Sequence, residues 1–183
     1  MQVLKNTEAR MDKALESLRR ELSVLRTGRA SAALLDGIQV DYYGMQTPVN
    51  QMAQITVPDA RQLAIKPYDK STLGSIERAI NEANIGLTPN SDGELIRLNI
   101  PVLTEERRRE LAKKVKGFAE DAKVAVRNIR RDANDELKKM QKINEITEDA
   151  LKGYTEDVQK LTDKKIKEVD VIASEKENDI MSL

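Results

Sequence analysis

The sequence predicts an α+β fold with two domains: a long antiparallel three-helix bundle, and a small β/α/β domain inserted between the first and second helices of that bundle. Six of the eight glycines and all five prolines lie between Gly28 and Pro101, so turn-forming residues are concentrated in the middle of the chain. The two flanks are rich in charge and repeat apolar residues at helical spacing. We therefore expect helices in the flanks and strands in the middle.

Two short crossings join the expected domains. We assign residues 1–29 and 104–183 to the bundle and residues 31–102 to the inserted domain. A pair of adjacent linkers is a natural hinge, and we expect one near 28–31 and 101–104. The expected hinge residues are Gly28, Arg29, Ala30, Ser31, Pro101, Val102 and Leu103.

The composition narrows the chemistry that we expect. The 183 residues include no cysteine, histidine or tryptophan. Disulfides, thiol nucleophiles, imidazole acid–base catalysis and the usual zinc ligands are therefore excluded. No apolar run approaches the roughly 20 residues of a membrane span, and the first residues lack the apolar core of a signal peptide. We expect a soluble, cytoplasmic protein with no metal site and no membrane partner.

The first expected helix covers about residues 7–26. Glycine is common just after a helix, so Gly28 predicts its end. Its apolar residues are spaced by four and three in turn, as in helices that pack into bundles. They are Met11, Leu15, Leu18, Leu22 and Leu25.

The middle segment alternates apolar and polar residues with the period of a β-strand. We expect strands near 38–42, 53–57, 62–66 and 94–100, and a helix over 73–83. Neighbours on a strand point to opposite faces, so we expect Tyr42 or Tyr43 in the core rather than a pair that stacks on bases. Asn90 to Gly93 is expected to form a turn.

Two longer helices complete the bundle. The second should begin with Thr104 as its N-cap and continue for about 38 residues, or ~57 Å. Its apolar seam is Leu111, Val115, Phe118, Ala122, Ala125, Ile129, Ala133, Leu137 and Met140. The third should run from Thr147 toward Ile180. Its apolar positions are Leu151, Tyr154, Val158, Leu161, Ile166, Val169, Ile172 and Ile180.

The second long helix sorts its charges onto two sides of the seam. One side, which we call the basic stripe, is positively charged, and its only acidic residues are Glu105 and Glu120. The stripe is Arg109, Lys113, Lys116, Lys123, Arg127, Arg130, Arg131 and Lys138. The other side gathers Glu106, Glu110, Asp121, Asp132 and Asp135.

Two interpretations of the basic stripe remain open. It is either a solvated face whose cations pair with acidic neighbours, or a phosphate-binding surface ~30–40 Å long. Three arginines within five residues favour phosphate, because a guanidinium donates two parallel hydrogen bonds to it. The simplest interpretation of the Arg26–Ser31 segment is a helix end whose arginines interact with the negative end of the helix dipole. No pair of carboxylates stands out as a catalytic site.

Several motifs together resemble the ribosome recycling factor family. They occur in the family's order and span the chain: Arg26-Thr27-Gly28-Arg29-Ala30-Ser31, Leu34-Leu35-Asp36-Gly37-Ile38, Tyr42-Tyr43-Gly44, Gly86-Leu87-Thr88-Pro89-Asn90, Leu103-Thr104-Glu105-Glu106-Arg107-Arg108 and Val126-Arg127-Asn128-Ile129-Arg130-Arg131-Asp132-Ala133-Asn134. The resemblance implies a bundle and a β/α/β domain with a tRNA-like outline.

The resemblance also implies a non-enzymatic function. The family binds the ribosome after peptide release. With elongation factor G it then splits the particle into subunits, so that mRNA and tRNA are released for a new round of translation. The partners implied are the ribosome, chiefly large-subunit rRNA, and elongation factor G, for a protein that is itself a monomer. No cofactor is implied, because GTP is used by elongation factor G.

The same resemblance places the family's contact arginine at Arg130. The expected rRNA-binding residues are Arg130, Arg127, Arg131, Lys123, Lys116 and Arg109. Without the resemblance, the residues support only a helical protein that binds RNA or another partner. Two alternatives are an adaptor bundle whose stripe binds an acidic protein, and a carboxylate enzyme in the α+β domain, for which the sequence offers no support.

Overall fold

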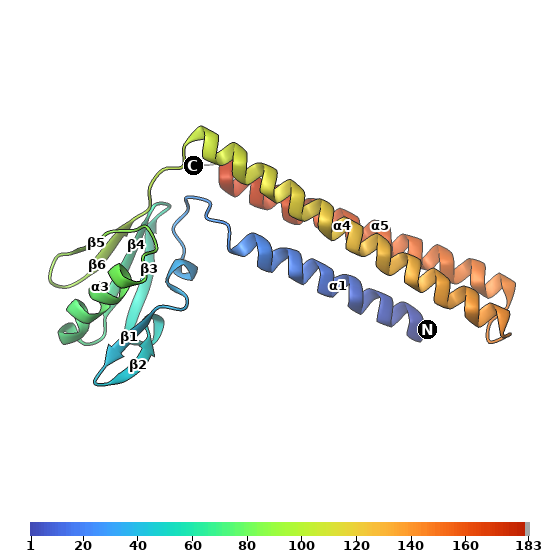
Figure 1. The fold of residues 1–183 in the computed structure, drawn as a ribbon, viewed down its shortest axis with the longest axis horizontal. Coiled ribbons are helices and arrows are strands. Elements are labelled where there is room, and N and C mark those ends of the chain that lie inside the picture. The colour runs from blue at the N-terminus through green and yellow to red at the C-terminus, as the bar shows by residue number, and fades with distance from the viewer. Residues whose placement is uncertain (182–183) are drawn as a thin grey trace. The chain divides into compact units, whose positions relative to one another are not determined.

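A computed structural model describes residues 1–181, which separate into two compact units. One unit contains residues 1–26 and the helices from Glu105 onward, and the other contains residues 27–104. Three long helices form the first unit, and all of the described strands lie in the second (Figure 1). The predicted α+β fold is confirmed.

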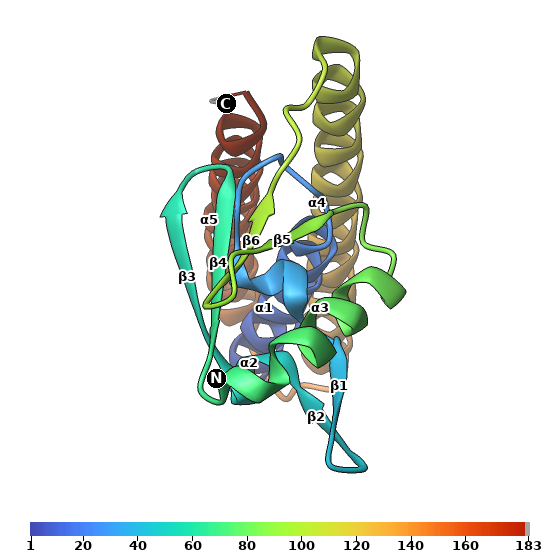
Figure 2. The ribbon, with the colours of Figure 1, turned by 90° about the vertical axis from the view of Figure 1, so that its left-hand side faces the viewer.

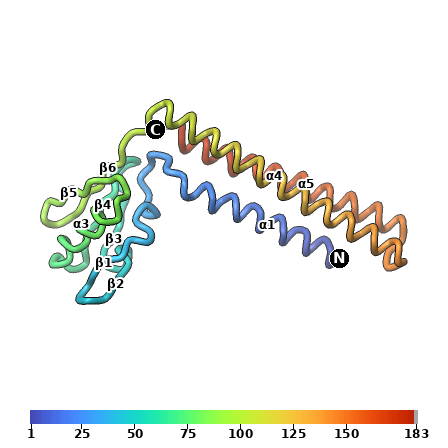
Figure 3. The backbone as a smooth tube through the Cα atoms, in the orientation of Figure 1, coloured from blue at the N-terminus to red at the C-terminus, as the bar shows by residue number. Residues whose placement is uncertain are grey.

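The helical unit contains α1 (Gln2–Ser23), α4 (Glu105–Lys142) and α5 (Glu148–Met181). α4 runs antiparallel to α5 after a tight turn, and α1 runs antiparallel to α4 (Figure 3). α1 packs against both of the other helices. Since α1 ends at Ser23, the prediction that it reaches residue 26 is wrong, and the helix also begins five residues earlier than residue 7. The threonine in its first half is accommodated because Thr7 Oγ1 donates to the Val3 carbonyl at 2.7 Å.

The buried seam of the bundle differs in part from the predicted one. In α4, Ala119 and Val126 are buried where Phe118 and Ala125 were expected. The predicted seam follows the 3.5-residue repeat of a coiled coil, whereas a straight helix has 3.6 residues per turn and rotates out of that repeat. The buried residues of α4 are Leu111, Val115, Ala119, Ala122, Val126, Ile129, Ala133 and Leu137.

A charged residue lies in the seam of α5. Lys165 is 5% exposed, and its Nζ is 2.6 Å from Asp12 Oδ1 on α1 and 3.7 Å from Glu168 Oε1. The sequence predicts Ile166 in the seam instead, but Ile166 is only half-buried. The ion pair with Asp12 compensates the buried ammonium group and connects α5 to α1.

The second unit contains two antiparallel sheets. β1 (Gln39–Tyr42) pairs with β2 (Met45–Pro48). The larger sheet has the order β3–β4–β6–β5, formed by Ala53–Asp59, Gln62–Pro67, Ile96–Asn99 and Pro89–Ser91. Helix α3 (Leu73–Glu82) lies on the near side of the strands in Figure 2 and contributes Ile76 and Ile80 to their apolar core. The short helix α2 (Val49–Met52) and two 3₁₀ turns, Ala32–Leu35 and Lys70–Thr72, fill the connections.

Tyr42 and Tyr43 lie at the tip of the β1–β2 hairpin, so the expectation that one of them is in the core is wrong. Tyr42 is 37% exposed and Tyr43 is 82% exposed. Tyr43 and Gly44 have φ values of 51° and 82°, which is the backbone of a tight hairpin turn. Tyr43 has therefore left the alternating strand pattern, and its ring meets that of Tyr42 edge-on, with centroids 4.7 Å apart.

The turn that was expected from Asn90 to Gly93 begins two residues later than predicted. Asn90 and Ser91 belong to β5, and the turn begins at Asp92. Asp92 Oδ1 accepts hydrogen bonds from the backbone N–H groups of Glu94 and Leu95 at 3.0 and 2.9 Å. These bonds hold the charged form of the side chain and lower the pKa of Asp92.

Gly28 lies where the two ends of the second unit meet. Its φ is +76°, and an added Cβ would stand 3.0 Å from Leu103 Cγ. We predict that Gly28→Ala lowers the free energy of unfolding by about 2 kcal/mol, because the backbone strain and the contact both oppose a side chain. Gly37→Ala is the matched control, since φ is +80° and nothing lies within 4 Å of its Cβ. Chemical denaturation should show a smaller loss for Gly37→Ala, and equal losses would contradict a role for Leu103.

Candidate nucleic-acid interface

The basic stripe lies on the side of α4 that borders α5. Lys123 Nζ is 2.6 Å from Asp170 Oδ1, and Arg130 Nη1 donates to Gln159 Oε1 at 3.3 Å. The acidic side of α4 borders α1 instead, where Asp132 pairs with Arg10 at 2.9 Å. The charge sorting noted in the sequence therefore corresponds to the two different neighbours of α4.

Two of the six predicted rRNA-binding residues already pair with acids. The side chain of Lys123 is only 17% exposed, and its hydrogen bond to Asp170 is the main cause of a raised pKa for Lys123. This lysine contributes to the packing of α4 on α5. Arg109 Nη2 lies 2.6 Å from Glu105 Oε1, but both side chains are exposed, so water and salt screen that pair and a phosphate can compete for it.

Three predicted residues have free cationic groups. Arg127, Arg131 and Lys116 make no hydrogen bond or ion pair within residues 1–181. Arg131 and Lys116 are exposed, and Arg127 is half-buried. Positive charge that no neighbouring acid compensates attracts polyanions, so this part of the stripe is suited to a phosphate backbone.

Arg130 lies between Arg127 and Arg131 but differs from them in its hydrogen bonding. It is half-buried, and its Nε is covered by protein with no hydrogen-bond partner among the described residues. One turn further along α4, the covered Oδ1 of Asn134 also has no partner within that part of the chain. Most buried polar atoms in proteins have a hydrogen-bond partner, so two without one make this part of α4 unusual.

The sequence did not reveal that two polar residues of α5 lie beside Arg130. Gln159 Oε1 accepts a hydrogen bond from Arg130 Nη1, and Gln159 Nε2 donates to Asp163 Oδ1 at 2.9 Å. No sequence pattern could have identified these two polar residues, because the contact depends on the register of α5 against α4. Glutamine and aspartate on an exposed helix side are otherwise unremarkable.

The expected hinge residues lie outside the helices and strands of the second unit, but several are fixed to it. The backbone N–H of buried Ala30 donates to the Ala60 carbonyl at 2.7 Å, and Ser31 Oγ accepts from the N–H of Ala33. On the other crossing, Pro101 and Val102 are exposed, and Leu103 is half-buried. Ala30 and Ser31 are therefore anchored to the second unit.

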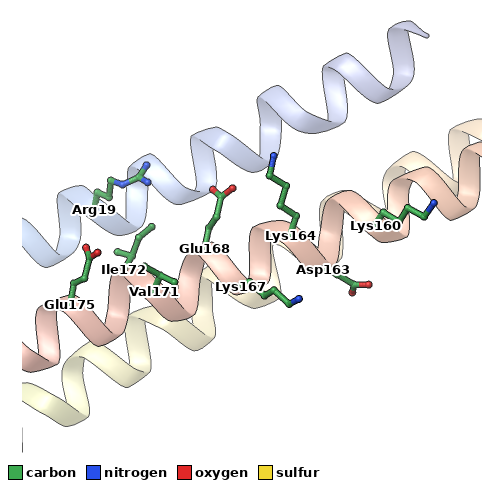
Figure 4. Close-up of a pocket in the computed structure, with 9 residues that line it drawn as sticks. All are labelled: Arg19, Lys160, Asp163, Lys164, Lys167, Glu168, Val171, Ile172 and Glu175. Atoms are coloured by element: carbon green, nitrogen blue, oxygen red, sulfur yellow. The ribbon is translucent and has the colours of Figure 1, made fainter.

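A second surface feature is a groove of about 670 Å³ along α1 and α5 (Figure 4). Lys164 and Glu168 point toward α1 in this view, while Asp163 and Lys167 point away from it. The lining residues are Arg19, Lys160, Asp163, Lys164, Lys167, Glu168, Val171, Ile172 and Glu175. Its cations and acids nearly balance, so the groove lacks the single sign of charge that distinguishes the stripe on α4.

The helices within residues 1–181 do not combine the length and hydrophobicity that a membrane span requires. The acidic side chains of the same residues form no group of three that could hold a metal ion.

Comparison with known proteins gives a consistent set of matches. The family model described as ribosome recycling factor matches residues 18–181. The ribosome-recycling factor of Bacillus cytotoxicus is 60% identical over 182 residues, covering 100% of this chain and 98% of the relative. That of Staphylococcus saprophyticus is 59% identical and covers 99% and 98%.

Two solved structures share the fold. A solution structure of a ribosome recycling factor is 41% identical, with a TM-score of 0.76 over 100% of this chain and 97% of the other. The second is the T. thermophilus ribosome recycling factor, described together with E. coli elongation factor G bound to the E. coli post-termination complex. It is 43% identical, with a TM-score of 0.65 over 98% and 97% of the two chains.

Proposed function

The chain belongs to the ribosome recycling factor family, and from this premise we propose that it acts with elongation factor G to split the post-termination ribosome into subunits. Members of this family are non-enzymatic translation factors. The relative seen with elongation factor G on the post-termination complex is 43% identical to this chain, which supports the same partners here. The splitting releases mRNA and tRNA for a new round of translation, in the cytoplasm, and the protein acts as a monomer.

In the proposed mechanism the helical unit binds and elongation factor G supplies the work. This mechanism needs no nucleotide on the protein itself, because the GTP is hydrolysed by elongation factor G. The helical unit binds large-subunit rRNA through the basic stripe on α4. The single observation that supports this choice of surface is the set of cations on this side of α4 that have no partner within residues 1–181: Arg127 and Arg131, which flank Arg130, and Lys116, nearer the start of the helix.

The predicted site residues contribute unequally in this proposal. Arg130 makes the principal phosphate contact, and the three free cations add charge along the backbone of the RNA. Arg109 also binds phosphate, which replaces Glu105 as the partner of its guanidinium. Lys123 acts mainly through its pair with Asp170, which keeps α5 beside the stripe.

The two crossings serve as the hinge in this proposal. Movement of the second unit about Gly28, Arg29 and the segment of Pro101, Val102 and Leu103 lets elongation factor G displace it while the bundle stays bound. Ala30 and Ser31 move with the second unit because both are fixed to it. Small-angle scattering should then require several interdomain angles, and a profile that one fixed angle reproduces would contradict the hinge.

Competition binding separates rRNA from an acidic protein as the partner of the stripe. We predict that purified large-subunit rRNA helices displace the protein from large subunits, whereas polyglutamate of equal charge does not. Arg127→Ala and Arg131→Ala should each reduce the slope of log K against log salt concentration by about one. Lys160→Ala, in the mixed-charge groove, is the control and should leave the slope unchanged. Displacement by polyglutamate alone would favour the adaptor function.

A further inference from the structure

We infer that Gln159 and Asp163 of α5 are positioning residues that hold the guanidinium of Arg130 ready for a phosphate. The inference rests on the proposed function, because it concerns how the same rRNA contact is made. It assigns part of the interface to a helix that lacks the basic stripe. α5 would then determine the geometry of the contact, and α4 would supply the charge.

Two hydrogen bonds connect Asp163 to Arg130 through Gln159, and we call this chain of contacts the relay. Asp163 Oδ1 accepts from Gln159 Nε2 at 2.9 Å, one turn away on the same helix. Donation to a carboxylate fixes which end of the amide faces which neighbour, because only the nitrogen end can donate. The amide oxygen is thereby presented to Arg130, whose Nη1 donates to it at 3.3 Å.

The surroundings of the Arg130 guanidinium explain why a residue that positions it is useful. Its Nε is covered and has no partner in residues 1–181, so only the two Nη groups remain to contact RNA. Gln159 occupies one hydrogen of Nη1 and leaves the other donors of the Nη pair available. A phosphate must then approach the guanidinium end-on, and a side chain already held in place loses less rotamer freedom when it binds.

The chemistry of the relay also preserves the charge of Arg130. A carboxylate placed directly on the guanidinium would form a bidentate ion pair and compete with phosphate. The neutral amide of Gln159 separates the Asp163 charge from Arg130 while still fixing the arginine. Arg127 and Arg131 have no such holder among the described residues, which leaves them free to adapt to the RNA.

A double-mutant cycle on the full chain tests the inference. Gln159→Leu, Arg130→Ala and the double variant are compared for binding to large subunits at several salt concentrations. We expect Gln159→Leu alone to weaken binding about threefold to fivefold, because Arg130 must then lose its rotamer freedom when it binds. In the Arg130→Ala background it should cause no further loss, since the group that it positions is absent. Asn178→Leu removes another exposed amide of α5 and is the control that should bind normally.

Asp163 offers a second, independent readout. Asp163→Asn keeps an oxygen acceptor for Gln159 but removes the charge, whereas Asp163→Ala removes both. If positioning matters, Asp163→Ala binds more weakly than Asp163→Asn at every salt concentration. If Asp163 acts only by repelling phosphate, both variants bind more tightly than the wild type and equally well, which would overturn the relay.

The outcomes distinguish this inference from the proposed function. Weaker binding by Arg130→Ala together with normal binding by Gln159→Leu would overturn the positioning role and leave the rRNA site standing. Equal losses from Gln159→Leu in both backgrounds would show that Gln159 acts independently of Arg130, and would also overturn it. Normal binding by Arg130→Ala would remove the proposed site and the inference together. Matching thermal unfolding curves would confirm that the variants are folded.

Discussion

Arg130→Ala is expected to weaken binding to the large ribosomal subunit by about tenfold, which corresponds to about 1.4 kcal/mol. The substitution removes the Nη donors that we assign to phosphate, from between Arg127 and Arg131, which have no ion pair within residues 1–181. The salt dependence of binding should decrease at the same time, because one fewer counterion is released from the RNA.

The shape of the guanidinium can be separated from its charge. Arg130→Lys keeps the charge but presents a point cation without the planar fork, so we expect affinity between that of the wild type and Arg130→Ala. Arg130→Ala should keep the helical content of the wild type, because the side chain of Arg130 is only half-buried. Circular dichroism checks the fold, and unchanged affinity of Arg130→Ala at matched salt would refute the assignment.

Asp12→Ala is expected to lower the free energy of unfolding by about 2–3 kcal/mol. It leaves the ammonium of Lys165, which is 5% exposed, with Glu168 at 3.7 Å as its remaining partner. Breaking a buried pair typically costs about 3–5 kcal/mol, and the remaining acid and the half-exposed side of Asp12 reduce that cost. Arg10→Ala, which breaks the exposed pair with Asp132, is the control and should cost less than about 1 kcal/mol.

Lys165→Met should be far less damaging than Asp12→Ala, because it removes the buried charge and fills the same space. Burial alone would lower the pKa of Lys165, but the hydrogen bond to Asp12, with the charges of Asp12, Glu168 and Glu8, raises it above 10.5. A raised lysine pKa stabilises the fold at all pH values below 10.5, and this stabilisation is lost as the pH rises through the folded value. Denaturation curves from pH 8 to pH 12 should show that loss in the wild type and a smaller one in Lys165→Met. Equal destabilisation by Asp12→Ala and Lys165→Met would show that the pair itself, and not the buried charge, matters.

The fold was largely predictable because its patterns are local. The helix of 38 residues in α4 followed from a long charged segment without proline, and the strands at Gln62–Pro67 and Ile96–Asn99 followed from simple alternation. β2 and β5 were missed, since they are short and mostly exposed and therefore lack an apolar period. Tyr43 was misplaced because a turn with positive φ interrupts the alternation, and Tyr42, the last residue of β1, is 37% exposed beside that turn.

The candidate site was predictable only on α4, where the sequence pattern and the helix period define a face. Which cations are free could not be read from the sequence. Lys123 and Arg127 lie one turn apart on that face, yet only Lys123 meets an acid of α5. Contacts between helices, such as Gln159 with Arg130 or Lys165 with Asp12, depend on how the helices are aligned, and no spacing within one helix encodes that.

Subunit splitting tests the central claim most directly. Post-termination ribosomes are mixed with elongation factor G from the same source, GTP and this protein, and light scattering is followed over time. The proposed function predicts a fall in scattering only when all three additions are present, and a slower fall with Arg130→Ala. Unchanged scattering with the complete mixture, under conditions in which a known ribosome recycling factor splits the same ribosomes, would contradict it.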